Sequence, residues 1–100
     1  MICALTVRKL KPGSFDQFRE AFMQPVTSGE MPAGWRHFNM VRGVQDPDEV
    51  ICFGFFDGTL EELRANAAQV GYQDQQATIA PYVESVGADG FYEVVEDRMP

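Results

Sequence analysis

The sequence predicts an α+β fold in which a four-stranded antiparallel sheet is formed in the order βαββαβ. Residues 50–56 are apolar at every position without alternation, which is typical of a strand buried on both faces. Residues 2–7 have the same character, and two segments with helical spacing of apolar residues separate the strand-like runs. Because the chain has 100 residues and 45% of them are hydrophobic, we expect one domain spanning residues 1–100.

The first strand and the first helix are expected within residues 2–26. Ile2–Val7 is β-rich, with Thr6 as the polar residue inside the run, and Pro12 and Gly13 end it. Ser14 followed three residues later by glutamine is a capping-box pattern that opens a helix. Aromatic and apolar residues then recur at helical spacing and predict a stripe that packs in the core: Phe15, Phe18, Phe22 and Val26.

A hairpin is expected in the middle of the chain. Residues 27–34 read as a loop, and Trp35–Val44 reads as a strand whose two faces differ in chemistry. The turn residues Asp46, Pro47 and Asp48 return the chain to the apolar run 50–56.

The second helical region is expected from Thr59 onward, because Glu62 completes a second capping box there. Its buried stripe comprises Leu60, Leu63 and Ala67. After an interruption at Gly71, helical character resumes at residue 73 and is expected to continue past Pro81 to residue 86. Residues 87–90 read as a loop and residues 91–96 as the last strand.

This order of elements is the ferredoxin-like arrangement, in which the first and third strands lie in the middle of the sheet. Those are the two runs without alternation, so pattern and topology agree. The helices cover one face only, which leaves a second apolar face with either Ala4, Cys52 and Phe56, or Leu5, Phe53 and Phe55. We expect a second copy of the chain to cover it in a two-fold homodimer formed through the sheet face.

Composition excludes several classes of partner and site. The formal net charge of −7 disfavours nucleic acid and anionic membranes as partners, and the apolar runs are too short to span a membrane. Cys3 and Cys52 lie in strand-like apolar runs and are expected to pack in the core. With one histidine in the chain, no metal site is expected. The chain reads as a cytoplasmic protein.

Three stretches carry a resemblance to a known family: residues 2–15, the hairpin 42–56 with its Asp-Pro-Asp turn, and residues 57–63. They resemble the dimeric α+β barrels and, within them, the antibiotic biosynthesis monooxygenase-like domains, over nearly the whole chain. The resemblance implies a homodimer with a ligand cleft between the helices and the sheet of each subunit. In some members this cleft is used to oxygenate aromatic polyketides without metal or flavin, and no cofactor is expected here.

Other members of the resembled family degrade haem with an Asn on the first strand, a Trp late in the third strand and a His on the following helix. The matching places in this chain hold Thr6, the Gly54–Phe55 region and the Gln75–Gln76 region, without a histidine. Haem degradation by that chemistry is therefore not expected.

Two strand residues are the candidates for catalysis. His37 has the side-chain type that titrates near neutral pH, so it is the candidate base for a phenolic or enolic proton. Asn39, on the same parity, is the candidate to hold the resulting oxyanion. The alternative interpretation makes His37 a surface or interface residue.

The expected ligand-binding residues surround the same cleft. Trp35 either stacks on an aromatic ligand or anchors the dimer interface. The other candidates are Thr6, Phe55, Tyr72, Gln76 and Tyr82. The arginines Arg8, Arg36 and Arg42 are expected to pair with the C-terminal acidic residues Glu93, Glu96 or Asp97 across the sheet or the dimer.

Two functions remain open from the sequence. The first is a homodimer that binds a small apolar or aromatic molecule, with cofactor-independent monooxygenation of an aromatic or polyketide-like substrate as its activity. The second is a non-catalytic binding or stress-associated dimer whose cleft is closed by Phe18, Phe22, Phe53 and Phe55. A cleft lined by His37, Tyr72 and Asn39 would favour the first function.

Overall fold

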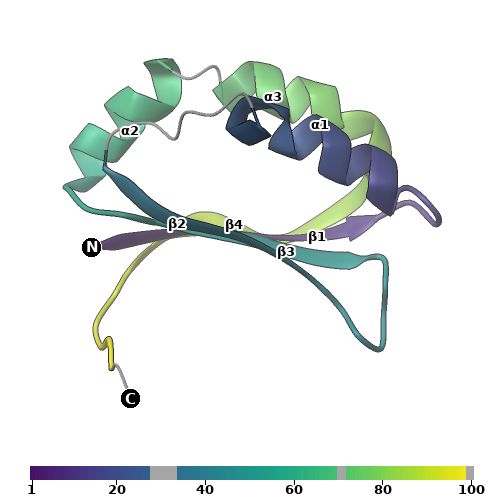
Figure 1. Cartoon of the computed structure of the whole chain (residues 1–100), viewed down its shortest axis with the longest axis horizontal. Helices are drawn as coiled ribbons and strands as arrows, with labels where there is room; N and C mark the ends of the chain where they lie inside the picture. The colour runs from purple at the N-terminus through teal and green to yellow at the C-terminus, as the bar shows by residue number, and fades with distance from the viewer. Residues whose placement is uncertain (28–33, 70–71, 99–100) are drawn as a thin grey trace.

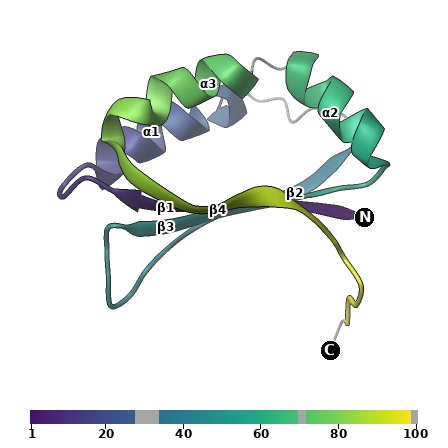
Figure 2. The ribbon, with the colours of Figure 1, turned by 180° about the vertical axis from the view of Figure 1, so that it is seen from behind.

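The computed structural model describes residues 1–27, 34–69 and 72–98. Its elements follow the expected order: β1 (Ile2–Leu10), α1 (Phe15–Thr27), β2 (Trp35–Arg42), β3 (Glu49–Phe56), α2 (Leu60–Gln69), α3 (Tyr72–Ile79), the 3₁₀ turn η1 (Ala80–Tyr82) and β4 (Val83–Glu93). This order confirms the predicted βαββαβ fold. Figures 1 and 2 show the three α-helices as one layer on one face of the sheet.

The sheet has the strand order β2-β3-β1-β4, and all of its neighbouring strands are antiparallel. The two strands without alternation in the sequence, β1 and β3, are therefore the central pair, as predicted. Ile2 lies opposite Phe56 and Lys9 opposite Glu49, so the pair is in register along nearly its whole length.

The core lies between the sheet and the helices. Along β3, alternate residues Val50, Cys52 and Phe56 are buried, as is Leu10 at the end of β1. Leu10, Val50 and Cys52 pack in one cluster with Phe18, Phe22 and Ile79 from the helices, and Leu63 of α2 is buried as well. The phenylalanine stripe of α1 thus forms core, as its spacing predicts.

The opposite face of the sheet is apolar, and none of the described helices lies on it (Figures 1 and 2). On β3 it presents Ile51, Phe53 and Phe55, which alternate with the buried positions and are only half-buried. Their partners on β1 are Val7, Leu5 and Cys3. We call this surface the outer face. In Figures 1 and 2 the β2–β3 turn and the C-terminal segment both bend toward this side, at opposite ends of the sheet.

The last strand begins earlier than expected. The prediction that the helical segment continues to residue 86 and that residues 87–90 form a loop is wrong, because the helical turn ends at Tyr82 and β4 runs from Val83 to Glu93. The 3₁₀ turn that contains Pro81 ends the helix, and Val83 already has extended angles, φ −101° and ψ 124°. From there the chain pairs with the free edge of β1, with a register shift between Val7 and Arg8 that leaves Gly87 without a partner. The glycine marks a bulge within a strand.

Among the described helices, none is both long and apolar enough to cross a membrane.

Candidate functional site

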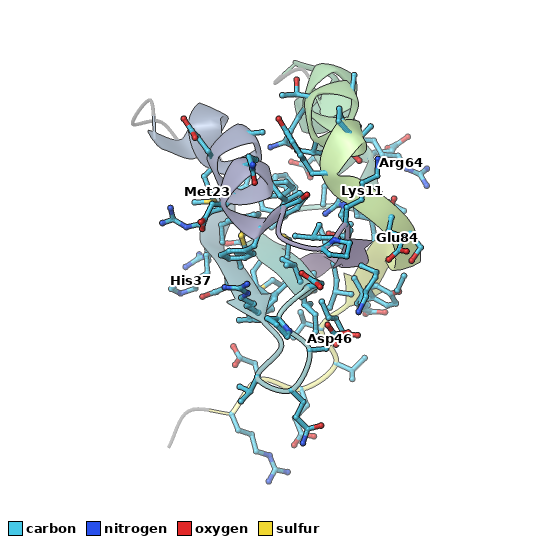
Figure 3. All side chains as sticks on the ribbon, turned by 90° about the vertical axis from the view of Figure 1, so that its right-hand side faces the viewer. Lys11, Met23, His37, Asp46, Arg64 and Glu84 are labelled. Atoms are coloured by element: carbon cyan, nitrogen blue, oxygen red, sulfur yellow. The ribbon has the colours of Figure 1, made fainter. Side chains whose placement is uncertain are left out.

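His37 and Asn39 lie on the outer face of the sheet. In the β2–β3 pairing His37 is opposite Phe55 and Asn39 is opposite Phe53, and opposed residues of an antiparallel pair point to the same side. Both side chains are exposed. Figure 3 shows His37 at the edge of the molecule, away from α1 and α3. Their expected placement between the helices and the sheet is therefore wrong, since the alternation of β2 turns them to the other side.

Phe55 also lies on the outer face, where its ring packs edge-on against that of Phe53, with the ring centroids 6.1 Å apart. Neither ring can line or close a space between the helices and the sheet. The side chains that the second functional interpretation placed together are therefore separated by the sheet, with Phe18 and Phe22 on one side and Phe53 and Phe55 on the other.

Trp35 faces the helices. Its ring makes an edge contact with Phe56 at a centroid distance of 5.4 Å, and the indole lies over Gly54. A Cβ atom at position 54 would come within 2.9 Å of the Trp35 ring, so only a glycine allows this close approach. Of the two roles expected for Trp35, its position on the helix side of the sheet favours contact with a ligand over contact with a partner subunit.

Thr6 and Gln76 meet in the interior through an arginine. Arg8 Nη1 donates a hydrogen bond to Thr6 Oγ1 at 2.6 Å, and Arg8 Nη2 donates to Gln76 Oε1 at 3.3 Å. Thr6 and Gln76, which the sequence singles out, are thus brought together by strand β1 and helix α3 across the layer. We call Arg8, Thr6 and Gln76 the polar cluster.

Arg8 is the residue of this site that the sequence prediction missed. Its exposed fraction is 2%, although arginine is among the residue types least often fully buried. The guanidinium carbon lies 5.9 Å from the centroid of the Phe18 ring and 5.5 Å from that of Phe22. The signal that was missed is the two-residue period of a strand. Thr6, Arg8 and Leu10 lie on the same face of β1, and all three are buried.

Within the described part of the chain, the three arginines have other partners than the C-terminal acidic residues with which pairing across the sheet was expected. Arg36 pairs with Asp57, with Nη2 and Oδ2 2.6 Å apart, and this pairing lowers the pKa of the Asp57 carboxyl. Arg42 donates to the carbonyl oxygen of Pro47 and lies over the ring of Phe15. Among the side chains that the structure describes, none forms a salt bridge with Arg8.

Cys52 lies beside the polar cluster, opposite Thr6 in the β1–β3 pairing. Burial raises the pKa of its thiol from 9.0 to about 11, although the charge of Arg8 and hydrogen bonds with Thr6 and Arg8 act in the lowering direction. The thiol is therefore neutral near pH 7 and supplies no negative charge to Arg8.

The two tyrosine candidates lie at opposite ends of the helical segment formed by α3 and η1. Tyr82 is half-buried at the end of η1 and packs against the core, and its carbonyl accepts a hydrogen bond from the Lys11 backbone N–H. Tyr72 begins α3, but its side chain lies outside the described part of the structure.

In the part that is described, no three His, Cys, Asp or Glu side chains lie close enough together to hold a metal ion.

Comparison with solved structures finds several proteins of the same fold. A proposed antibiotic biosynthesis monooxygenase from Deinococcus radiodurans superposes with a TM-score of 0.81 at 12% identity, covering 100% of this chain and 98% of that one. One from Nitrosomonas europaea gives a TM-score of 0.79 at 16% identity, covering 96% and 100%. One from Chloroflexus aurantiacus gives 0.77 at 15% identity, covering 98% and 96%.

The chain therefore has the fold of the antibiotic biosynthesis monooxygenase-like proteins, and the resemblance seen in the sequence is confirmed at the level of fold. At these identities the likeness concerns the fold and leaves the chemistry of the site to its own residues. No protein-family model matches the chain, and no curated protein matches it significantly.

Proposed function

We propose that this protein is a homodimer that binds a small, largely apolar molecule between the helices and the sheet of each subunit. The observation that carries the proposal is the polar cluster, which is buried in an otherwise apolar layer and is not satisfied by its own contacts. Among the described residues, Gln76 Nε2 is a buried donor without a hydrogen-bond partner. A buried donor left unpaired costs about 1–3 kcal/mol, so such groups in native proteins call for an explanation.

A bound molecule with an acceptor atom would supply the missing partner. The surroundings match a ligand that is mostly apolar, because the rings of Phe18, Phe22 and Phe38 stack in sequence with centroids 5.5 Å and 5.4 Å apart. Sites for small molecules in proteins typically combine apolar and aromatic walls with a few placed polar groups.

The apolar outer face of the sheet is the basis for the proposed dimer. Phe53, Phe55 and Leu5 form an apolar surface that no described helix covers, and the two bent ends that flank it carry Val44 and Val95 at 100% and 89% exposure. Contiguous apolar surface of this kind marks protein interaction sites. A second copy meeting it sheet to sheet would bury the same residues of both chains.

Monooxygenation of an aromatic or polyketide-like substrate is the activity we propose for the bound state. Its support is the naming of the fold relatives as proposed antibiotic biosynthesis monooxygenases. His37 lies on the other side of the sheet and the Cys52 thiol is neutral, so neither group supplies a base at the polar cluster. The substrate would therefore have to arrive already ionised, which ties the activity to phenols and enols of low pKa.

A thermal-shift screen against phenols, quinols and aromatic acids tests binding, because a molecule that binds only the native state raises its apparent stability. Oxygen consumption is then followed with each compound that binds. A rise in melting temperature with selected compounds is expected, and oxygen uptake with one of them would add the activity. An unchanged melting temperature with every compound of the panel would contradict the proposed ligand binding.

A further inference from the structure

We infer that the ligand carries an anionic oxygen on an aromatic body, and that Arg8 and Gln76 Nε2 bind this oxygen. The inference rests on the proposed function and names the class of molecule that its site would take: a carboxylate, phenolate or enolate. It is drawn from the charge, the hydrogen-bonding geometry and the apolar surroundings of the polar cluster.

The charge of the cluster is uncompensated within the described residues. Arginine keeps its positive charge in proteins, and a buried charge is normally paired or moved to the surface. Here the exposed fraction of Arg8 is 2%, and the groups that accept its described hydrogen bonds, Thr6, Gln76 and the Cys52 thiol, are all neutral. An anion entering this layer would meet one unpaired positive charge at low effective dielectric constant, where ion pairing is strong.

The hydrogen bonds also leave donors for such an anion. A guanidinium has five N–H groups, and the described bonds to Thr6, Gln76 and the Cys52 thiol leave some of them for a further acceptor. Because a guanidinium only donates, it holds the amide oxygen of Gln76 toward itself, and this turns Nε2 away to a buried place where none of the described residues accepts from it. Both unmet needs, a negative charge and a hydrogen-bond acceptor, are met by one anionic oxygen.

The aromatic part of the ligand follows from the rings around Arg8. Phe18 and Phe22 lie within 5.9 Å and 5.5 Å of the guanidinium carbon and provide partial compensation through their π faces. Both rings are themselves buried, so the layer around the guanidinium is apolar and matches a ring attached to the anionic group. A free inorganic anion has no such apolar part, so we expect it to bind far more weakly than an aromatic acid.

A matched pair of probes tests the inference: 2-naphthoate and the neutral 2-naphthamide, measured by calorimetry and thermal shift on the full chain. We expect naphthoate to bind at least tenfold more tightly than naphthamide. Arg8→Met should abolish this preference, while Arg19→Met, which removes an exposed arginine of α1, should leave it unchanged. Equal binding of acid and amide, or an unchanged preference in Arg8→Met, would overturn the anionic class and leave small-molecule binding intact.

Gln76→Glu provides a second test that does not require removal of the arginine. The new carboxylate would stand where Oε1 already accepts from Arg8, so it would pair internally with the guanidinium. We expect a higher melting temperature and loss of naphthoate binding, with the exposed Gln17→Glu of α1 behaving as wild type. Full naphthoate affinity in Gln76→Glu would overturn the inference, and failure of wild type to bind either probe or any compound of the screen would overturn the proposed function itself.

Discussion

At the scale of single residues, Cys52 shows how burial sets chemistry in this fold. Its side chain is 3% exposed, and burial is the largest cause of the rise of its pKa from 9.0 to about 11. The folded state therefore holds the proton more tightly than the unfolded state does. The resulting stabilisation is fully present below pH 9 and is lost as the pH rises toward 11.

We predict that this linkage is measurable as a difference between two proteins. Between pH 9 and pH 11 the wild type should lose about 2 kcal/mol more free energy of unfolding than Cys52→Ala, since one pKa unit corresponds to about 1.4 kcal/mol. Denaturant unfolding across this range provides the measurement, and the shared lysines and tyrosines cancel in the comparison. Parallel curves for the two proteins would show that the thiol has the same pKa folded and unfolded.

His37 gives a second prediction at this scale. Because it is exposed on the outer face opposite Phe55, we expect His37→Ala to bind naphthoate as the wild type does. Calorimetry on the variant measures this directly. A large loss of ligand affinity, with the dimer intact, would instead return His37 to the ligand site.

At the scale of elements, the start of α2 shows a capping box formed as its spacing predicts. The Glu62 N–H donates to Thr59 Oγ1 at 3.2 Å, and the Thr59 N–H donates back to Glu62 Oε1 at 3.1 Å. Thr59→Ala removes the first of these bonds, and we expect it to lower the free energy of unfolding by about 1 kcal/mol. Thr59→Ser keeps the hydroxyl and should recover most of the loss in the same denaturant titration, and equal losses in both variants would contradict the role of the cap.

How far the elements could be predicted depended on how local their signals are. The capping box at Thr59 and the unbroken apolar runs of β1 and β3 are local features, and they placed α2 and the central strands correctly. Strand β4 has no such signal, because Gly87 and Gly90 interrupt it and its pairing with β1 is a tertiary contact. A glycine at a bulge and a glycine in a loop look the same in sequence.

The candidate site could be predicted only in part for a related reason. Thr6 was singled out as the polar residue inside an apolar strand and Gln76 as a polar residue of the helical side. The arginine that joins them was expected to pair with the C-terminal acidic residues instead. Its burial depends on α3 packing over β1, which brings together residues separated by 68 positions in the chain. His37 and Asn39 were misplaced because a strand pattern defines two faces without showing which one meets the helices.

At the scale of the whole molecule, the sheet separates two surfaces with different roles. The face toward the helices holds the polar cluster, and the outer face holds apolar side chains that alternate with it along the same strands. We therefore assign ligand binding to the side of the helices and self-association to the outer face. A change on one side should leave the function of the other side intact, because the two sets of side chains do not meet across the sheet.

The dimer is the claim on which this division depends, and sedimentation equilibrium at micromolar concentration tests it most directly. We predict the mass of two chains for the wild type, the mass of one chain for Phe53→Glu, which places a charge on the outer face, and the mass of two chains for Ala77→Glu, an exposed position on α3. A compact monomer for the wild type would contradict the account, because the apolar outer face would then be stable in water without a partner.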